Sequence, residues 1–172
     1  MSSIASSTRK KVPRAQRQRW RLSELFLHLS DEERRDVYTA ASVELGLPAK
    51  ILEKDVSICW TLDTLFSDSD RYPMAFKGGT SLSKVYAVIS RFSEDIDITV
   101  STASSPADGV LPTSRKRADT LRAAVEVELD EYLQDHVRPL LGKALVAIPG
   151  GSEDAVAKVD NETIVLATQA AS

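Results

Sequence analysis

The chain has little cysteine and no long apolar stretch, and both shortages limit what it can be. Cys59 is the single cysteine among its 172 residues, so no internal disulfide can form and a reducing, cytosolic setting is expected. No run approaches the roughly eighteen consecutive apolar residues of a transmembrane helix. The N-terminus also lacks the apolar core of a secretory signal peptide. We therefore expect a cytoplasmic protein without membrane contact.

Two familiar kinds of catalytic signature are missing as well. The phosphate-binding pattern Gly-x-x-x-x-Gly-Lys-Ser/Thr does not occur. His28 and His136, the two histidines, fall in expected helices with no nearby nucleophile pattern, so we expect surface or packing roles for both. The hydrophobic share of 42% is nevertheless enough to build a real core. A globular chain of one domain, with or without an appendage, fits this length.

Basic residues are distributed unevenly along the chain. The net charge is −3, from 22 basic and 25 acidic residues, yet residues 9–21 hold seven of the basic ones and no acid. Such a segment either contacts nucleic acid phosphates or is a solvated tail that leads into the first helix, and the sequence leaves both interpretations open. We interpret residues 1–21 as a basic, partly disordered N-terminal arm and residues 22–172 as the folded domain.

Apolar spacing predicts helices in the first two-thirds of the chain and strands from residue 74 onward. Ser30 and Glu33 form a capping box for a helix that runs to Leu45 and stops at Gly46. The other expected helices span residues 20–29, 49–66, 81–90 and 115–140. The expected strands span residues 74–77, 95–100, 145–148, 155–159 and 163–168, the last two as a hairpin. The pattern predicts an α+β fold with a small mixed β-sheet flanked by helices.

The segment Gly78-Gly79-Thr80-Ser81 opens one of the expected helices and has the features of a phosphate-binding turn. The two glycines permit backbone conformations that other residues resist and let a ligand approach closely. Thr80 can cap the helix, and the free N–H groups of a first helical turn attract an anion. Lys84 lies one turn later and could reach a phosphate as a point charge. A Gly-Gly pair alone, however, is often only a turn.

Asp95 and Asp97 form the second candidate element. Residues two apart on a strand project to the same face, about 6–7 Å apart, and two unpaired carboxylates that close repel each other. A divalent cation removes that cost, and magnesium favours one or two carboxylates together with phosphate oxygens. The alternative is an exposed strand face with solvated acids. Ile96 and Ile98 on the opposite face indicate a strand that is buried on one side, where a site is well supported.

Taken together, these motifs resemble a known family. The run Phe-Lys-Gly-Gly-Thr-Ser-Leu-Ser-Lys at residues 76–84 and the run Arg-Phe-Ser-Glu-Asp-Ile-Asp-Ile at residues 91–98 are similar to those of the AbiEii/AbiGii-type nucleotidyltransferase toxins. These toxins belong to the DNA-polymerase-beta-like nucleotidyltransferase superfamily. Glu-Lys-Asp at residues 53–55 also resembles that family. The likeness covers residues 48–100 best.

The resemblance implies a nucleotidyltransferase fold and a toxin of a toxin–antitoxin or abortive-infection system. Such an enzyme transfers a nucleotide from an NTP to an acceptor, typically tRNA, with Mg²⁺ or Mn²⁺. An antitoxin encoded nearby, without stable contact, would be its partner. Carried over residue by residue, Gly78, Gly79, Thr80 and Ser81 bind the nucleotide, Asp95 and Asp97 bind metal and act in catalysis, and Lys84 holds phosphate as a third catalytic residue.

Two elements of the family pattern are not found in the chain. A third strand carboxylate normally follows, and so does a helical C-terminal half with further charged residues. We therefore expect a domain that lacks the family's C-terminal helical part. This departure keeps a second interpretation open, namely a truncated and catalytically inactive module that binds a nucleotide or a partner.

Overall fold

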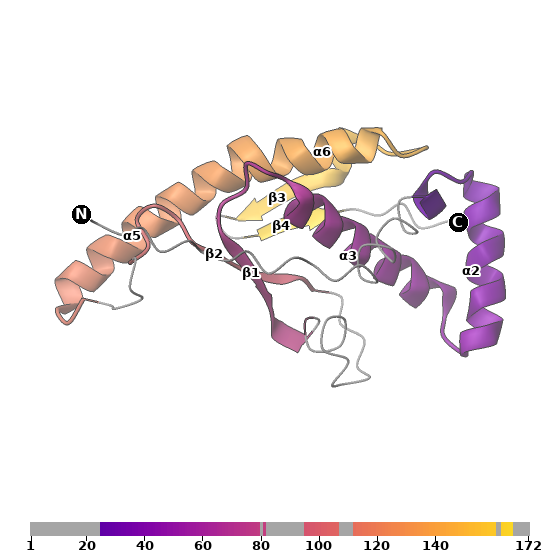
Figure 1. Cartoon of the computed structure of the whole chain (residues 1–172), viewed down its shortest axis with the longest axis horizontal. Helices are drawn as coiled ribbons and strands as arrows, with labels where there is room; N and C mark the ends of the chain where they lie inside the picture. The colour runs from indigo at the N-terminus through magenta and orange to yellow at the C-terminus, as the bar shows by residue number, and fades with distance from the viewer. Residues whose placement is uncertain (1–24, 80, 82–94, 107–111, 161–162, 167–172) are drawn as a thin grey trace, which may run out of the picture.

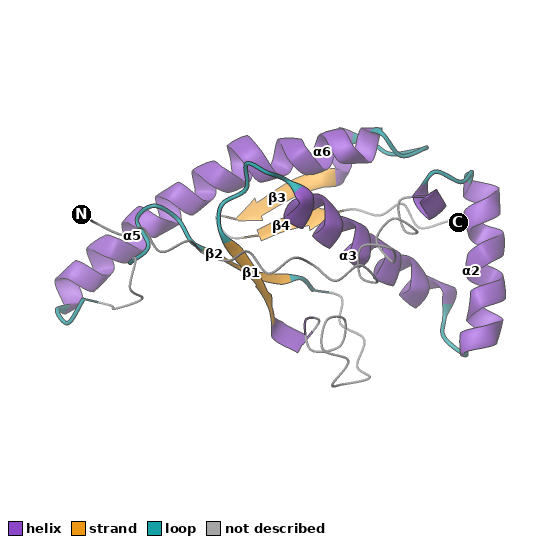
Figure 2. Cartoon of the chain, viewed as in Figure 1, coloured by secondary structure: helices purple, strands orange, loops and turns teal. Residues whose placement is uncertain are grey.

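The computed structural model describes residues 25–79, 81, 95–106, 112–160 and 163–166. Helices dominate this part of the chain, and four short strands accompany them (Figures 1 and 2). The α+β class predicted from the sequence is confirmed. In chain order the elements are α2 (Asp31–Leu45), α3 (Ala49–Ser67), β1 (Met74–Lys77), β2 (Asp97–Val100), α5 (Arg115–Tyr132), the π-helical turn η1 (Leu133–Val137), α6 (Arg138–Val146), the 3₁₀ turn η2 (Glu153–Ala155), β3 (Val156–Asp160) and β4 (Thr163–Leu166).

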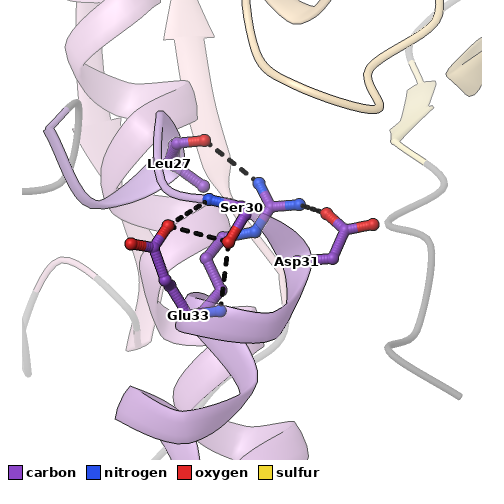
Figure 3. A network of polar contacts seen from close by, with 5 residues as sticks. Leu27, Ser30, Asp31 and Glu33 are labelled. Carbon is purple, nitrogen blue, oxygen red and sulfur yellow. Dashed lines mark hydrogen bonds and ion pairs between the residues drawn. The ribbon is translucent and has the colours of Figure 1, made fainter.

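The predicted capping box begins α2 (Figure 3). The backbone N–H of Glu33 donates to the Ser30 hydroxyl at 3.3 Å, and the Glu33 carboxylate accepts from the Ser30 N–H at 2.9 Å. Arg34 completes the network, because its guanidinium pairs with Asp31 and donates to the Leu27 carbonyl at 3.1 Å. Hydrogen bonds from Ser30 hold the pKa of Glu33 below its usual value. These contacts fix the start of the helix where sequence spacing placed it.

Helix α3 follows its predicted span and ends one residue later than expected. Its buried residues are Ile58, Trp60, Thr61, Leu62 and Leu65, all in the second half of the helix. The helix contacts both α2 and α6, and it runs from beside α2 toward α6 (Figure 1). Its second half therefore enters the core, which includes Trp60 and Leu65.

The helix that begins at Arg115 is longer than expected and overturns one predicted strand. Residues 145–148 were expected to be extended, but α6 continues to Val146. Leu141, Leu145 and Ile148 recur at helical spacing and all pack on the core, which explains the outcome. The chain then turns at Pro149-Gly150-Gly151, where Gly150 has φ 77°. None of the described helices is long and apolar enough to cross a bilayer.

The described strands form two separate antiparallel pairs, so the single mixed sheet expected from the sequence is wrong for this part of the chain. β1 pairs with β2, and β3 pairs with β4. The second pair is the predicted hairpin, and β3 lies against α6 (Figure 1). The helix expected over residues 81–90 lies outside the described residues apart from Ser81, and the N-terminal arm lies outside them entirely. The core joins α3, the long helix and β3 through Trp60, Leu65, Tyr132, Val137, Leu141 and Val156.

Candidate functional site

The register of the β1–β2 pair places Asp97, one of the two candidate aspartates. Lys77 pairs with Asp97 at one end of the ladder, and Met74 pairs with Val100 at the other. Burial alternates along residues 95–100 as the sequence predicted, with Asp95 and Asp97 exposed and Ile98 packed against the core. Asp95 lies two residues before Asp97 and just outside the strand. The apolar face of this segment therefore packs on the core, and the carboxylates of Asp95 and Asp97 are exposed on the opposite face.

Gly78 lies directly against the carboxylate of Asp97. Its φ is +76°, and a Cβ built at this position would overlap Oδ2 of Asp97 and come within 2.9 Å of its Cγ. Gly78 follows β1 immediately, and residues 78 and 79 are already helical. Only glycine satisfies both the left-handed backbone and the close approach. The turn and the aspartate, which the sequence treated as separate motifs, are thus in contact.

The other predicted nucleotide-binding residues follow this turn. The Ser81 hydroxyl donates to the Gly78 carbonyl at 2.8 Å, and Ser81 is buried. Its side chain therefore supports the turn from inside. Gly79 is exposed, and a Cβ there would meet no atom within 4 Å. Thr80 and Lys84, the remaining predicted residues, lie outside the described part of the chain.

A cavity of about 680 Å³ opens beside the two aspartates. Its lining comes from α3, from both strands of the first pair, from the α5–η1–α6 helix and from β4. Asp97 contributes to it from β2, Asp95 from the residues just before that strand, Lys77 from β1 and Lys54 from α3. Aliphatic side chains make up most of the rest. A space of this size, mostly apolar with a few charged groups, is typical of a small-molecule site.

The donor set in this cavity suits a hard cation better than a soft one. Asp95 and Asp97 supply carboxylate oxygens, the ligands that magnesium takes together with water and phosphate. Among the described residues, no group of three or more His, Cys, Asp or Glu side chains could hold a metal. A metal in this part of the chain would therefore depend on the two aspartates and on oxygens from the ligand.

Aromatic and charged residues stabilise the segment that leads into β1. The sequence did not predict that these residues contact one another. His136 Nε2 lies 2.7 Å from Asp68 Oδ2. The His136 ring stacks on Tyr132, and Tyr132 stacks on Tyr72 with centroids 4.3 Å apart. The Tyr72 N–H donates to the Tyr132 hydroxyl at 3.2 Å. The sequence predicted a surface or packing role for His136, but it gave no signal that His136 meets Asp68.

These contacts shift two ionisation equilibria. The hydrogen bond from His136 lowers the pKa of Asp68, and burial raises the pKa of Tyr132. η1, which carries His136, is a π-helical turn, a feature often found near functional sites. Since Tyr132 also lines the cavity, the Asp68–His136 pair connects the loop before β1 to the cavity wall.

Glu128 on α5 holds the loop that follows β2. Its carboxylate accepts the backbone N–H groups of Ala103 at 2.7 Å and Ser104 at 2.9 Å. The bonds from Ser104 and Ala103 lower the pKa of Glu128. Within the same loop, Thr102 donates its N–H to the Ser105 hydroxyl at 3.1 Å. The C-terminal end of β2 is therefore tied to the long helix.

One comparison with known proteins yields a match. A family model described as "Nucleotidyl transferase AbiEii toxin, Type IV TA system" matches residues 60–167, which is more than half of the chain. The matched segment contains β1, the Gly78 turn, both aspartates, the long helix and the second strand pair. No curated protein and no solved structure matches the chain.

Proposed function

Because the chain belongs to the AbiEii family of nucleotidyl transferase toxins of type IV toxin–antitoxin systems, we propose that it is a magnesium-dependent enzyme that transfers a nucleotide from an NTP to tRNA or another RNA. The observation that carries the proposal is the contact between Gly78 and Asp97 at a cavity that Asp95 also lines. A phosphate-binding turn and a pair of carboxylates within one site suit phosphoryl chemistry.

In this proposal the residues of the turn bind the triphosphate. Gly78 and Gly79 leave room for the phosphates to approach the backbone. Ser81 brings an N–H group of a helical turn, which attracts anions, and the sequence prediction adds the hydroxyl of Thr80 and the positive charge of Lys84. The Ser81 hydroxyl is engaged with the Gly78 carbonyl, so its contribution is to hold the turn in shape.

Asp95 and Asp97 are the residues that would hold Mg²⁺ or Mn²⁺. When bound, the cation supplies positive charge for the phosphate oxygens and lowers the pKa of an attacking hydroxyl. In the reaction, an acceptor hydroxyl oxygen forms a bond to the α-phosphorus of the NTP. The bond between that phosphorus and the oxygen of the leaving pyrophosphate breaks, and the hydroxyl proton passes to solvent or a nearby base.

The biological setting follows from the family. A toxin of a type IV system is opposed by an antitoxin, and we propose that this antitoxin is encoded nearby and does not form a stable complex with the chain. An enzyme that modifies RNA with cellular NTPs would act in the cytoplasm. The basic segment at residues 9–21 would contribute to RNA recruitment through phosphate contacts.

A transfer assay tests the proposal. The purified chain is incubated with total RNA, magnesium and each of the four α-labelled NTPs in turn. We expect label in RNA with one NTP, and its loss when EDTA is added. If the folded chain labels RNA with none of the four NTPs, the proposed transfer to RNA is contradicted.

A second candidate function is a catalytically inactive module that binds nucleotide. It is favoured by the lack of a third acidic group beside Asp95 and Asp97 among the described residues. An inactive module would still bind an NTP in a calorimetric titration yet transfer no label. Running the titration beside the transfer assay on the same preparation separates the two candidates.

A further inference from the structure

Two lysines line the same cavity as the two aspartates. Among the described residues, the charged side chains of the lining are Lys54, Lys77, Asp95 and Asp97. A triphosphate placed next to two carboxylates would be repelled unless cations were close. A metal ion held by the aspartates would supply part of the positive charge that the triphosphate requires. The two lysines can supply the remainder.

Lys54 lies on the face of α3 that lines the cavity. The residues of this face recur at helical spacing, and they are Lys54, Ser57, Ile58, Thr61 and Leu65. The hydroxyl of Ser57 and the hydroxyl of Thr61 each donate to a helix carbonyl four residues earlier, at 3.0 Å and 2.8 Å. Lys54 is the charged residue of this face, and its ammonium group carries N–H donors.

Lys77 approaches the aspartates from the strand pair. It is the last residue of β1, it is exposed, and it pairs with Asp97 in the antiparallel register. Directly paired residues project to the same face with Cβ atoms about 4.5–5.5 Å apart. Lys77 also immediately precedes Gly78, so its side chain starts from the base of the phosphate-binding turn.

We propose that Lys54 and Lys77 bind phosphate groups of the nucleoside triphosphate in this cavity, an inference that rests on the proposed function. Each lysine carries a compact charge with three donors on a flexible stem, which suits phosphate oxygens in several positions. Lys54 lies outside the segment that matches the family, residues 60–167. Its contribution is thus indicated by the position of α3 in the cavity wall, which the strand pair also lines.

The test measures binding with inorganic tripolyphosphate as the probe, which carries the phosphates without base or sugar. Calorimetric titrations in magnesium buffer would compare the unaltered chain with Lys54→Met and Lys77→Met, which keep most of the apolar stem. We expect the Kd for tripolyphosphate to rise about tenfold for each variant, since a charge-assisted hydrogen bond is lost. Lys54→Arg and Lys77→Arg should recover part of the affinity.

Two exposed lysines outside the lining provide matched controls. Lys50 lies one turn before Lys54 on α3, and Lys143 lies on α6. Lys50→Met and Lys143→Met should bind tripolyphosphate as the unaltered chain does. Circular dichroism and urea midpoints identify any variant that fails to fold, and Lys54→Arg gives a second folded comparison for Lys54.

The outcomes separate the inference from the function on which it rests. Unchanged tripolyphosphate affinity in both folded methionine variants would overturn the inference. If the lysines only neutralise the aspartates, the same variants would bind Mn²⁺ more tightly and tripolyphosphate equally well, which also overturns it. Lysine-dependent tripolyphosphate binding by a chain that labels no RNA would support the inference and contradict the transferase. A chain that binds neither tripolyphosphate nor NTP contradicts both.

Discussion

The carboxylate of Asp97 rests against the Cα of Gly78, where β1 ends and the glycine turn begins. The two residues are nineteen positions apart in the sequence, and the β1–β2 register brings them together. The contact makes the turn and the aspartate one structural unit. A change in the glycine should therefore alter the position of the carboxylate as well as the backbone.

Gly78→Ala should destabilise the chain for two reasons. The alanine would adopt a left-handed φ of +76°, which costs about 1–2 kcal/mol, and its Cβ would displace the Asp97 carboxylate. We expect a loss of at least that size in the free energy of unfolding, measured by urea titration, together with loss of transfer. Gly79→Ala is the stability control, because a Cβ there meets no atom within 4 Å.

A second substitution separates the two costs. In an Asp97→Ala background the overlaps with Oδ2 and Cγ are gone and only the Cβ of residue 97 remains, 3.1 Å away, so Gly78→Ala should retain the backbone cost and a smaller steric one. The double variant should then lose less unfolding free energy than the two single variants lose together, and the four unfolding free energies give the size of this coupling. Additive costs would contradict a direct contact between Gly78 and the Asp97 carboxylate.

The paired substitution Asp95→Asn with Asp97→Asn should abolish transfer while preserving the fold. Both side chains are exposed at the cavity, so their shape can be kept and their charge removed at little cost in stability. We expect transfer and toxicity to fall at least about a thousandfold, with Mn²⁺ binding lost in calorimetry. Undiminished toxicity of this double variant in cells would contradict the proposed mechanism.

Local signals explain the parts of the fold that the sequence predicted well. The Ser30–Glu33 capping box, the alternation along residues 95–100 and the hairpin β3–β4 all depend on residues close together in the chain. The short apolar run at residues 145–148 was ambiguous between helix and strand. Its state is decided by Leu145 and Ile148, which pack on a core built by distant segments.

The candidate site was likewise predictable where it depends on local sequence, and not where it depends on contacts between distant segments. The order of the glycine turn and the two aspartates predicted a shared site, and the structure places Gly78, Asp95 and Asp97 together. The roles of these residues stay predictions. The place of Lys54 in the cavity lining could not be predicted from spacing, because it depends on how distant segments of the chain pack around the cavity. The contact between Asp68 and His136 spans 68 residues and left no local signal either.

The Asp68–His136 pair should make stability depend on pH. The pKa of Asp68 is lowered from 3.8 by its bond to His136, so the folded state favours the ionised carboxylate. This contribution is complete above the unfolded pKa, and it is lost as pH falls through the lowered folded value. Asp68→Ala should cost on the order of 1 kcal/mol near pH 7 because the pair lies near the surface.

Urea titrations from pH 7 to pH 2 measure this difference. The gap between the unaltered chain and Asp68→Ala should shrink as pH falls below about 4. Asp70→Ala, an exposed change in the same loop, is the control and should show a smaller gap at neutral pH. A gap for Asp68→Ala that stays constant down to pH 2 would show that the carboxylate charge contributes nothing.

Glu128 should determine how firmly the loop after β2 is held. Its carboxylate accepts two backbone N–H groups, so Glu128→Ala should speed amide hydrogen exchange at Ala103 and Ser104 by roughly tenfold. The pKa of Glu128 is lowered from 4.5, so protection should persist above that value and fade as pH falls through the lowered pKa. Glu126→Ala, an exposed change on the same helix, should leave both amides protected. Equal exchange in all three proteins would mean that contacts other than those of Glu128 hold the loop. The connection of β2 to α5 would then not depend on Glu128.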